Sequence, residues 1–389
     1  MLETDSPADT DDTITPMKTP QSSRLFTRWL NPSNGVESLI LTERPAPVQR
    51  QFYFTNRNIT DDGRFMWVSC SYPPDGGRLA VPVLAVVDFE RDEMRVCHET
   101  QYSGESPLVD PVNGEVYWGN DLDLWKRGPR PNDRPVRVNT FPRELTKGRR
   151  LSHIASDLSF SADHKSVNVN AEFNNEEWLV GDMPLDGSPV RVWQSSDSRD
   201  VHCQFSPTDP DLQLLVRDYW GRAPEKFDPE FRYHRMYLLR RGGKPEPLLA
   251  EPISHQGHEW WDPDGKHVWF VHYGVGVKKV NIQTREERNL WPGHLAHAYA
   301  DRTGRYLVAD MMATPYEPDC HVVFRDTVTG KEIEIVNSPQ LGKDLTQCGH
   351  LHPHPQFCQN DRYICHTTTV HNRVDLALVP TEDLIARTR

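Results

Sequence analysis

A short hairpin phrase recurs along this chain of 389 residues. Each copy has a bulky apolar residue, a turn rich in Asp, Pro, Asn and Gly, and then an alternating hydrophobic strand, which is typical of a β-hairpin. Seven copies begin at residues 59, 109, 160, 205, 261, 300 and 357, with spacings of 50, 51, 45, 56, 39 and 57 residues. A propeller blade has a similar period, ~40–50 residues. The repeat therefore predicts an all-β fold, a seven-bladed β-propeller.

The two ends of the chain are expected to meet in the last blade, because a propeller ring needs one sheet that both ends share. The strand-like stretch 38–42 is predicted to complete that blade beside 374–379. Residues 1–22 are rich in Asp, Thr, Ser and Pro, and we expect them to form a disordered acidic tail. Residues 23–389 are then a single propeller domain.

The composition of the chain limits the kinds of binding partner and the cellular compartments that we expect for it. A formal net charge of −12 argues against a general nucleic-acid binder, which needs basic groups to neutralise phosphates. No apolar run approaches the ~20 residues of a membrane span. Seven scattered cysteines without a CxxC pair do not form a disulfide scaffold or a thiolate zinc site. We expect a cytoplasmic protein without a membrane anchor, and the oligomeric state stays open.

The repeat brings histidines into register. The residue three places before each leading apolar residue is, in order, Asn56, Ser106, Asp157, His202, His258, His297 and His354. Four consecutive copies therefore carry histidine at one repeat position. That position is expected on the innermost strand of each blade, beside the central axis. Residues far apart in the sequence should converge there.

A second histidine pattern precedes the last hairpin. In the stretch Gly349-His350-Leu-His352-Pro-His354-Pro, histidines alternate with other residues, and the prolines keep the chain extended. Alternate residues of an extended chain point the same way, so His352 and His354 face one point and His350 can join them. Imidazole is the commonest metal ligand, and we interpret the set as a divalent-metal site. The competing interpretation is that each histidine bonds a backbone group or lines a solvated channel.

From about Gln49 onward the sequence resembles the oligogalacturonate lyase family of cytoplasmic β-propeller polysaccharide lyases, which act on pectin fragments. The resemblance is carried by a set of motifs in a fixed order: His202 with Phe205, Arg235-Met236, His258-Glu-x-Trp261-x-Pro-Asp-Gly265, His297 before Gly304, and His352-Pro-His354-Pro-x-Phe357 with Asn360-Asp361.

The resemblance implies a manganese ion held by His297, His352 and His354. The family also has a glutamine ligand three residues before the histidine pair, where this chain has Gly349. Gln347 or His350 could replace it, and the choice among Mn, Fe, Ni and Zn is not determined by affinity trends alone.

The resemblance further implies that His258 is the Brønsted base. Arg235 would hold a substrate carboxylate or stabilise the intermediate. His202 and Arg50 are candidate substrate-binding residues. The implied reaction is β-elimination from a 4-linked uronide, most simply an oligogalacturonate, to a 4,5-unsaturated product.

The chemistry of that reaction agrees with these residue types. The C5 proton is α to a carboxylate and becomes acidic only when the negative charge beside it is neutralised, as a divalent cation or an arginine can do. A neutral histidine suits proton removal near neutral pH. Three alternatives stay open: a non-catalytic propeller that binds protein partners, a hydrolase or epimerase that uses the same metal, and a lyase for another uronide such as a glucuronide.

Overall fold

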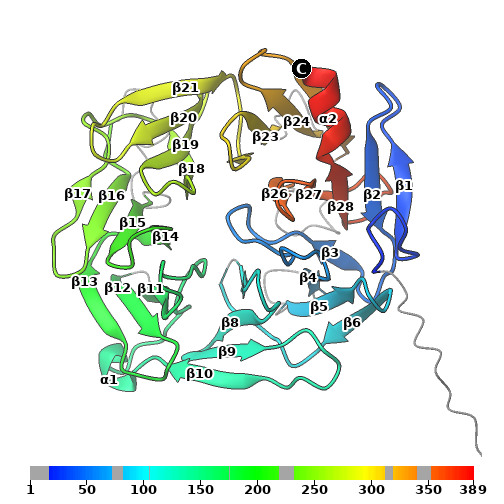
Figure 1. The fold of residues 1–389 in the computed structure, drawn as a ribbon. Helices are drawn as coiled ribbons and strands as arrows, with labels where there is room; N and C mark the ends of the chain where they lie inside the picture. The colour runs from blue at the N-terminus through cyan, green and yellow to red at the C-terminus, as the bar shows by residue number, and fades with distance from the viewer. Residues whose placement is uncertain are drawn as a thin grey trace, which may run out of the picture.

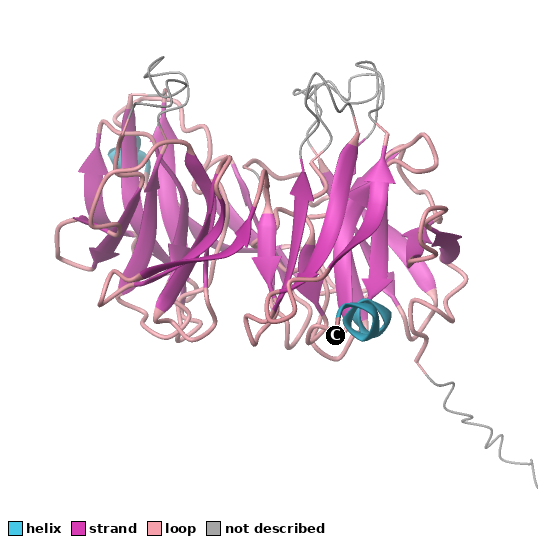
Figure 2. Cartoon of the chain, turned by 90° about the horizontal axis from the view of Figure 1, so that it is seen from above, coloured by secondary structure: helices cyan, strands magenta, loops and turns pink. Residues whose placement is uncertain are grey.

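The computed structural model describes residues 17–71, 82–104, 106–174, 176–218, 232–311, 319–339 and 352–389. Seven antiparallel sheets stand in a ring around a common axis (Figure 1). Seen from the side, the strands run roughly along that axis (Figure 2). The predicted seven-bladed β-propeller is confirmed, and each copy of the hairpin phrase falls in a different blade.

The blades are numbered from the first hairpin phrase, and within each blade the strands are given from the axis outward. Blades 1 to 3 contain β3 (Val48–Arg50), β4 (Phe65–Ser71), β5 (Val83–Asp88) and β6 (Glu93–Cys97); β7 (Leu108–Val109), β8 (Val116–Asn120), β9 (Asp123–Arg127) and β10 (Val136–Thr140); and β11 (Ser166–Phe173), β12 (Glu177–Pro184) and β13 (Arg191–Ser196). Blades 4 to 6 contain β14 (Asp200–Phe205), β15 (Leu212–Arg217), β16 (Met236–Arg240) and β17 (Glu246–Pro247); β18 (Gln256–Trp261), β19 (His267–His272), β20 (Gly276–Asn281) and β21 (Glu287–Pro292); and β22 (Ala298–Ala300), β23 (Tyr306–Met311), β24 (Cys320–Asp326) and β25 (Glu332–Ser338).

Blade 7 closes the ring with strands from both ends of the chain. Its strands are β26 (Gln356–Cys358), β27 (Tyr363–Thr368), β28 (Asp375–Pro380), β2 (Glu37–Leu41) and β1 (Phe26–Leu30). The register pairs Leu39 with Leu378 and Ile40 with Ala377. The predicted closing pair is confirmed, and blade 7 has five strands because β1 follows β2 at its outer edge.

Apolar side chains fill the spaces between neighbouring blades. The largest fully buried ones are tryptophans and phenylalanines, among them Trp67, Trp118 and Trp269. Two short helices in the described residues, α1 (Arg143–Thr146) and α2 (Thr381–Thr388), are outside these sheets. The hydrophobic stabilisation therefore comes from strand faces packed blade on blade, as the alternating pattern of each hairpin requires.

Buried amide side chains join the innermost strands of adjacent blades near the axis. Gln204 Nε2 donates to the Glu259 carbonyl at 2.8 Å, which connects blade 4 to blade 5. Gln356 Nε2 donates to the Asn56 carbonyl, also at 2.8 Å, and connects blade 7 to blade 1. These bonds pair buried backbone carbonyls with side-chain donors, and they join neighbouring blades near the axis.

Some predictions concern segments at the chain's beginning. Residues 1–16 are outside the described part, and the Lys18 main-chain N–H donates to the Phe89 carbonyl at 3.0 Å. The domain boundary after residue 22 stays a prediction. Within the described residues, none of the helices has the length and apolar character needed to traverse a bilayer.

Candidate functional site

Three histidines from blades 6 and 7 meet near the propeller axis. His297 directly precedes β22, and His352 and His354 precede β26, so all three enter at the starts of inner strands. One ring nitrogen of each lies within 4.8 Å of one nitrogen of each of the others. The ring centroids of His297 and His354 are 4.3 Å apart, and those of His297 and His352 are 5.2 Å apart. The structure thus brings together His297 and His354, which the repeat aligned, and His352, which the alternation of the extended segment placed beside His354.

A buried carboxylate orients this triad. Asp310, on β23, has its two carboxylate oxygens 3.0 and 3.1 Å from His297 Nδ1. It also accepts hydrogen bonds from the main-chain N–H groups of His297 at 2.8 Å and His354 at 3.3 Å. Since the carboxylate accepts at Nδ1, that nitrogen carries the hydrogen and Nε2 carries the lone pair. A histidine held in this way is typical of metal ligands in proteins.

Both the geometry and the protonation state of the three histidines are suited to binding a divalent ion. Burial lowers the pKa of His297 and of His354 well below the usual histidine value, and the neighbouring imidazoles lower it further. Burial raises the pKa of Asp310 to about 6, so this group is an anion at neutral pH. Metal ligation requires neutral imidazole, and three histidines backed by one carboxylate suit Mn, Fe, Ni or Zn.

His258 lies against the triad. Its ring centroid is 3.8 Å from that of His297, with the planes 34° apart. Nδ1 is 2.7 Å from the Ala296 carbonyl oxygen and 2.9 Å from the Tyr273 hydroxyl. A carbonyl oxygen only accepts, so Nδ1 carries the hydrogen and the Nε2 lone pair is available as a base. Burial, and after it His297, lowers the pKa of His258 well below the usual value, which keeps the ring neutral.

Three of the four histidines at the shared repeat position near the axis have an unusual backbone conformation. His202, His258 and His354 have φ values of 47°, 52° and 49°, in the left-handed region that non-glycine residues seldom occupy. In β14 and β18 the strand register shifts at these residues, which is the mark of a β-bulge. A bulge redirects a side chain beside a functional site. Here it occurs at the one repeat position that carries the histidines.

The loop that follows β3 fills the space between these rings. Tyr53 stacks on His202 at 5.0 Å and 13° and meets His354 edge-on at 5.1 Å. Phe54 contacts His258 edge-on at 5.8 Å. Blade 1 therefore contributes two aromatic rings to a site whose histidines come from blades 4 to 7.

His202 pairs with an acid instead of joining the triad. Its Nδ1 lies 2.6 Å from Asp157 Oδ2. Asp157 occupies the equivalent repeat position of blade 3 and is 3% exposed, whereas the His202 side chain is 24% exposed. Burial disfavours the imidazolium, but the charge and hydrogen bond of Asp157 outweigh it, and the pKa of His202 is raised above the usual value. The surroundings thus favour the charged form of His202 and the neutral form of His258, although the two residues share a repeat position.

Arg235 lies buried between two carboxylates. Its Nε donates to Glu259 Oε1 at 2.6 Å and its Nη1 donates to Asp218 Oδ1 at 3.1 Å. Glu259 accepts from Nε and Asp218 accepts from Nη1, so Nη2 is the guanidinium nitrogen that can bind an anionic ligand. The two acids fix the guanidinium plane. The positive charge of Arg235 also acts on His202, whose pKa it lowers. Arg50 ends β3, is half-buried, and its positive charge helps to lower the pKa of His354.

Two further candidate ligands lie outside the described part of the chain. Gln347 and His350 lie in 340–351, outside the described residues. Other site residues were missed in the sequence: Asp310, Tyr53, Glu259, Asp218 and Tyr273. The sequence did contain a signal for Asp310, because a carboxylate interrupts the apolar run of β23. The structure shows that this carboxylate is fully buried. Tyr53 had none, since its loop belongs to no repeat element.

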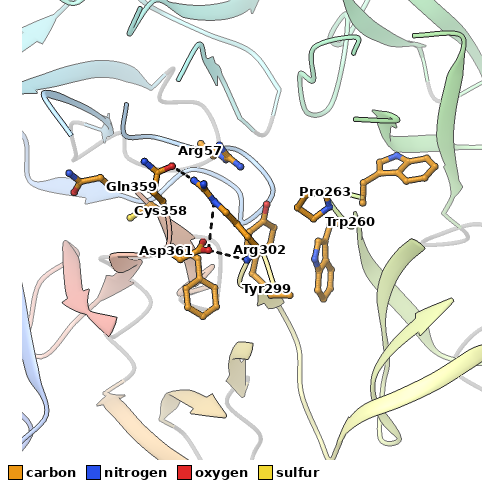
Figure 3. A pocket seen from close by; sticks show the side chains of 12 residues that line it. Arg57, Trp260, Pro263, Tyr299, Arg302, Cys358, Gln359 and Asp361 are labelled. Atoms are coloured by element: carbon orange, nitrogen blue, oxygen red, sulfur yellow. Dashed lines mark hydrogen bonds and ion pairs between the residues drawn. The ribbon is translucent and has the colours of Figure 1, made fainter. Parts of the chain in front are cut away.

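A separate pocket lies where the inner strands end, at the opposite end from the histidines. Its lining includes Arg57, Trp260, Tyr299, Arg302 and Asp361 (Figure 3). The Arg302 main-chain N–H donates to Asp361 Oδ2 at 3.0 Å, and its guanidinium pairs with the same carboxylate at 3.7 Å. The charged lining residues are the two arginines and Asp361, and no residue of the histidine triad lines this pocket.

Comparison with known proteins gives structural relatives and no sequence relatives. No family profile matches the sequence, and no curated protein matches it. A solved structure of an oligogalacturonate lyase in complex with manganese has a TM-score of 0.72 at 16% identity, over 91% of this chain and 96% of that one. An oligogalacturonate lyase from Vibrio parahaemolyticus has a TM-score of 0.73 at 15% identity, over 92% and 97% of the two chains. The resemblance inferred from the motifs is confirmed in the fold: over nine-tenths of its length, this chain has the propeller fold of oligogalacturonate lyase structures.

Proposed function

We propose that this protein is a metal-dependent lyase that cleaves 4-linked uronides by β-elimination and leaves a 4,5-unsaturated uronate. Short oligogalacturonides are the first candidate substrates, and a cytoplasmic location accompanies the proposal. The observation that carries it is the contact between a histidine triad fit for a metal and a neutral histidine fit to be a base, His258 against His297. The structural likeness to oligogalacturonate lyases supports the same reaction class.

His297, His352 and His354 would hold the divalent ion, with Mn²⁺ favoured because one of the structural relatives contains manganese. Either Gln347 or His350 is the candidate for a further ligand. When bound, the ion would supply Lewis-acid chemistry that draws electron density from the uronate carboxylate. Asp310 keeps His297 in the tautomer whose Nε2 is free for this purpose.

The chain's own residues would perform the proton and charge chemistry. His258 takes the C5 proton at Nε2 while the Ala296 carbonyl holds Nδ1. Arg235 offers Nη2 to a uronate carboxylate, and its two acidic partners keep its plane fixed. Arg50 and His202 border the same site and complete the set of candidate substrate contacts.

The decisive experiment incubates the manganese-loaded protein with short oligogalacturonides and, in parallel, with glucuronide oligomers. We expect one of these two sets of substrates to give a product whose new double bond is conjugated with the carboxylate. That product should raise the absorbance at the ultraviolet edge. Product masses should sum to the substrate mass, because elimination adds no water. The reaction should stop with a chelator and with His258→Ala. A matched control is His267→Ala, which removes a histidine bonded to Asp264 on the hairpin after β18, away from the triad.

Other outcomes assign the alternatives. Products heavier by one water would indicate a hydrolase, and inversion without chain cleavage would indicate an epimerase. Glucuronide cleavage alone would keep the reaction and change the substrate. A protein that binds metal but leaves every uronide intact would overturn the proposal and favour a non-catalytic propeller.

A further inference from the structure

The pair formed by His202 and Asp157 has the arrangement of a proton donor. The carboxylate of Asp157 lies 2.6 Å from His202 Nδ1, and an ionised carboxylate can only accept. Nδ1 therefore carries a hydrogen at all times. The second proton of the imidazolium is on Nε2, the nitrogen on the other side of the ring from Asp157.

The ring is held so that Nε2 keeps one direction. Tyr53 stacks against its face at 5.0 Å and 13°, and the His202 main-chain N–H donates to Ser156 Oγ at 2.8 Å. The bulged backbone, with φ of 47°, sets the exit direction of the side chain. Tyr53 also touches His354 edge-on, so a single aromatic ring separates His202 from the metal triad. With 24% of its side chain exposed, His202 can contact a ligand at that place.

The surroundings of His202 favour the charged form. Asp157 supplies a negative charge and a hydrogen bond that together outweigh the effect of burial on the pKa. Glu259 adds a weaker effect in the same direction, and Arg235 opposes it. Among the described residues, the titratable or charged groups near the ring, from the elements packed against it, are Asp157, His153, Tyr53, Arg235, Glu259, His258 and His297.

We propose that His202 is the general acid that protonates the departing O4 oxygen, and that Asp157 is the positioning residue that aims its Nε2–H. This inference rests on the proposed lyase function and extends it, because removal of the C5 proton by His258 leaves the leaving group without a proton donor. A sugar alkoxide is a poor leaving group, so the C4–O4 bond breaks readily only if O4 is protonated as it departs.

The step balances without a further reactant. The C5–H bond breaks and its proton moves to His258 Nε2. The electron pair of that bond forms the C4=C5 double bond, and the C4–O4 pair leaves with O4. The Nε2–H proton of His202 forms the new O4–H bond. His258 ends charged and His202 ends neutral, and exchange with water restores both.

The test compares two leaving groups. One substrate is an unmodified oligouronide, and the other is a uronate with a 4-nitrophenoxy group at C4, which departs as a stable anion and needs no proton. We expect His202→Gln to lose about 100- to 10,000-fold in kcat on the oligouronide. The same variant should keep close to the wild-type kcat on the nitrophenyl substrate.

Two controls separate this result from a general defect. His258→Ala should lose activity on both substrates, because both need the C5 proton removed. His267→Gln removes a comparable histidine–aspartate pair, 2.7 Å long and remote from the site, and should lose activity on neither. Equal losses by His202→Gln on both substrates would overturn the acid role, and so would full activity on the oligouronide. A wild-type protein inactive on both substrates would instead contradict the lyase function itself.

Asp157→Asn provides an independent measurement in case His202 variants fold poorly. Removing the negative charge should lower the pKa of His202, so the alkaline limb of the kcat profile for the oligouronide should move to lower pH. The profile for the nitrophenyl substrate should keep its alkaline limb in place. An oligouronide profile unchanged by Asp157→Asn would contradict the proposed pairing.

Discussion

Asp310 holds His297 by three contacts at once: both of its carboxylate oxygens lie within 3.1 Å of the ring Nδ1, and one of them also accepts the main-chain N–H at 2.8 Å. The Asp310 main-chain N–H returns a bond to the His297 carbonyl at 2.9 Å. A second bond from the carboxylate reaches the main chain of His354. One acid on β23 thus aligns candidate metal ligands from two blades.

Asp310→Asn should weaken metal binding. The amide keeps only one of the two oxygens that accept main-chain N–H groups, and it loses the charge that polarises the His297 ring. Loss of such a partner typically lowers metal affinity about 10- to 100-fold. Competition with a fluorescent chelator at fixed pH measures the Kd for Mn²⁺. Asp264→Asn, which removes the partner of His267, is the control and should leave the Kd unchanged. An Asp310→Asn protein with wild-type affinity would show that the triad does not depend on this acid.

Bound metal should stabilise the folded chain through the triad. An ion that binds only the folded state at 100 times its Kd raises the free energy of unfolding by about 2.7 kcal/mol. Urea unfolding of chelator-treated protein, with and without Mn²⁺, measures this difference. His352→Ala should abolish the gain, since it removes one of three ligands, while His267→Ala should retain it. A gain that persists in His352→Ala would place the ion elsewhere.

Arg235→Ala should destabilise the fold as well as impair activity. The change leaves Asp218 and Glu259 without their shared cation, and Glu259 is 2% exposed. Removing one partner of a buried ion pair costs about 3–5 kcal/mol. Arg240→Ala breaks the exposed pair with Asp209 on the same blade and should change the free energy of unfolding by less than about 1 kcal/mol. Urea unfolding measures the free energy of unfolding of both variants. Equal losses in the two variants would contradict the stabilising role of the buried Arg235 ion pairs.

Backbone strain at His258 should be measurable by comparing the stabilities of its glycine and alanine variants. His258 has φ of 52°, where a side chain costs roughly 1–2 kcal/mol that glycine avoids. We therefore expect His258→Gly to be more stable than His258→Ala. His297, whose φ is not positive, should show the reverse order, with Gly less stable than Ala by roughly 0.5–1 kcal/mol. Thermal unfolding of the four variants provides the comparison, and the same order at both positions would argue against strain at His258.

Much of the site could be predicted because its information is local. Each hairpin phrase marks its own turn and strand, so counting back three residues reaches the same place in every blade, and the blades' circular arrangement brings those places together. The Pro-spaced pair His352 and His354 needed only the alternation of an extended chain. The hydrogen-bond partners were harder to predict, because Asp310 reaches His297 from the next strand and Glu259 reaches Arg235 from the neighbouring blade.

By itself, the sequence determined the number of blades, the strand pair that closes the ring and the positions that point to its axis, since these follow from short-range alternation and a repeating period. Only the tertiary structure decided which of the histidines near the axis form the candidate metal site and which one pairs with an acid. His202 and His258 hold the same repeat position, yet Asp157 favours the charged form of one while burial beside His297 keeps the other neutral. That difference depends on contacts between blades, which no local pattern in the chain encodes.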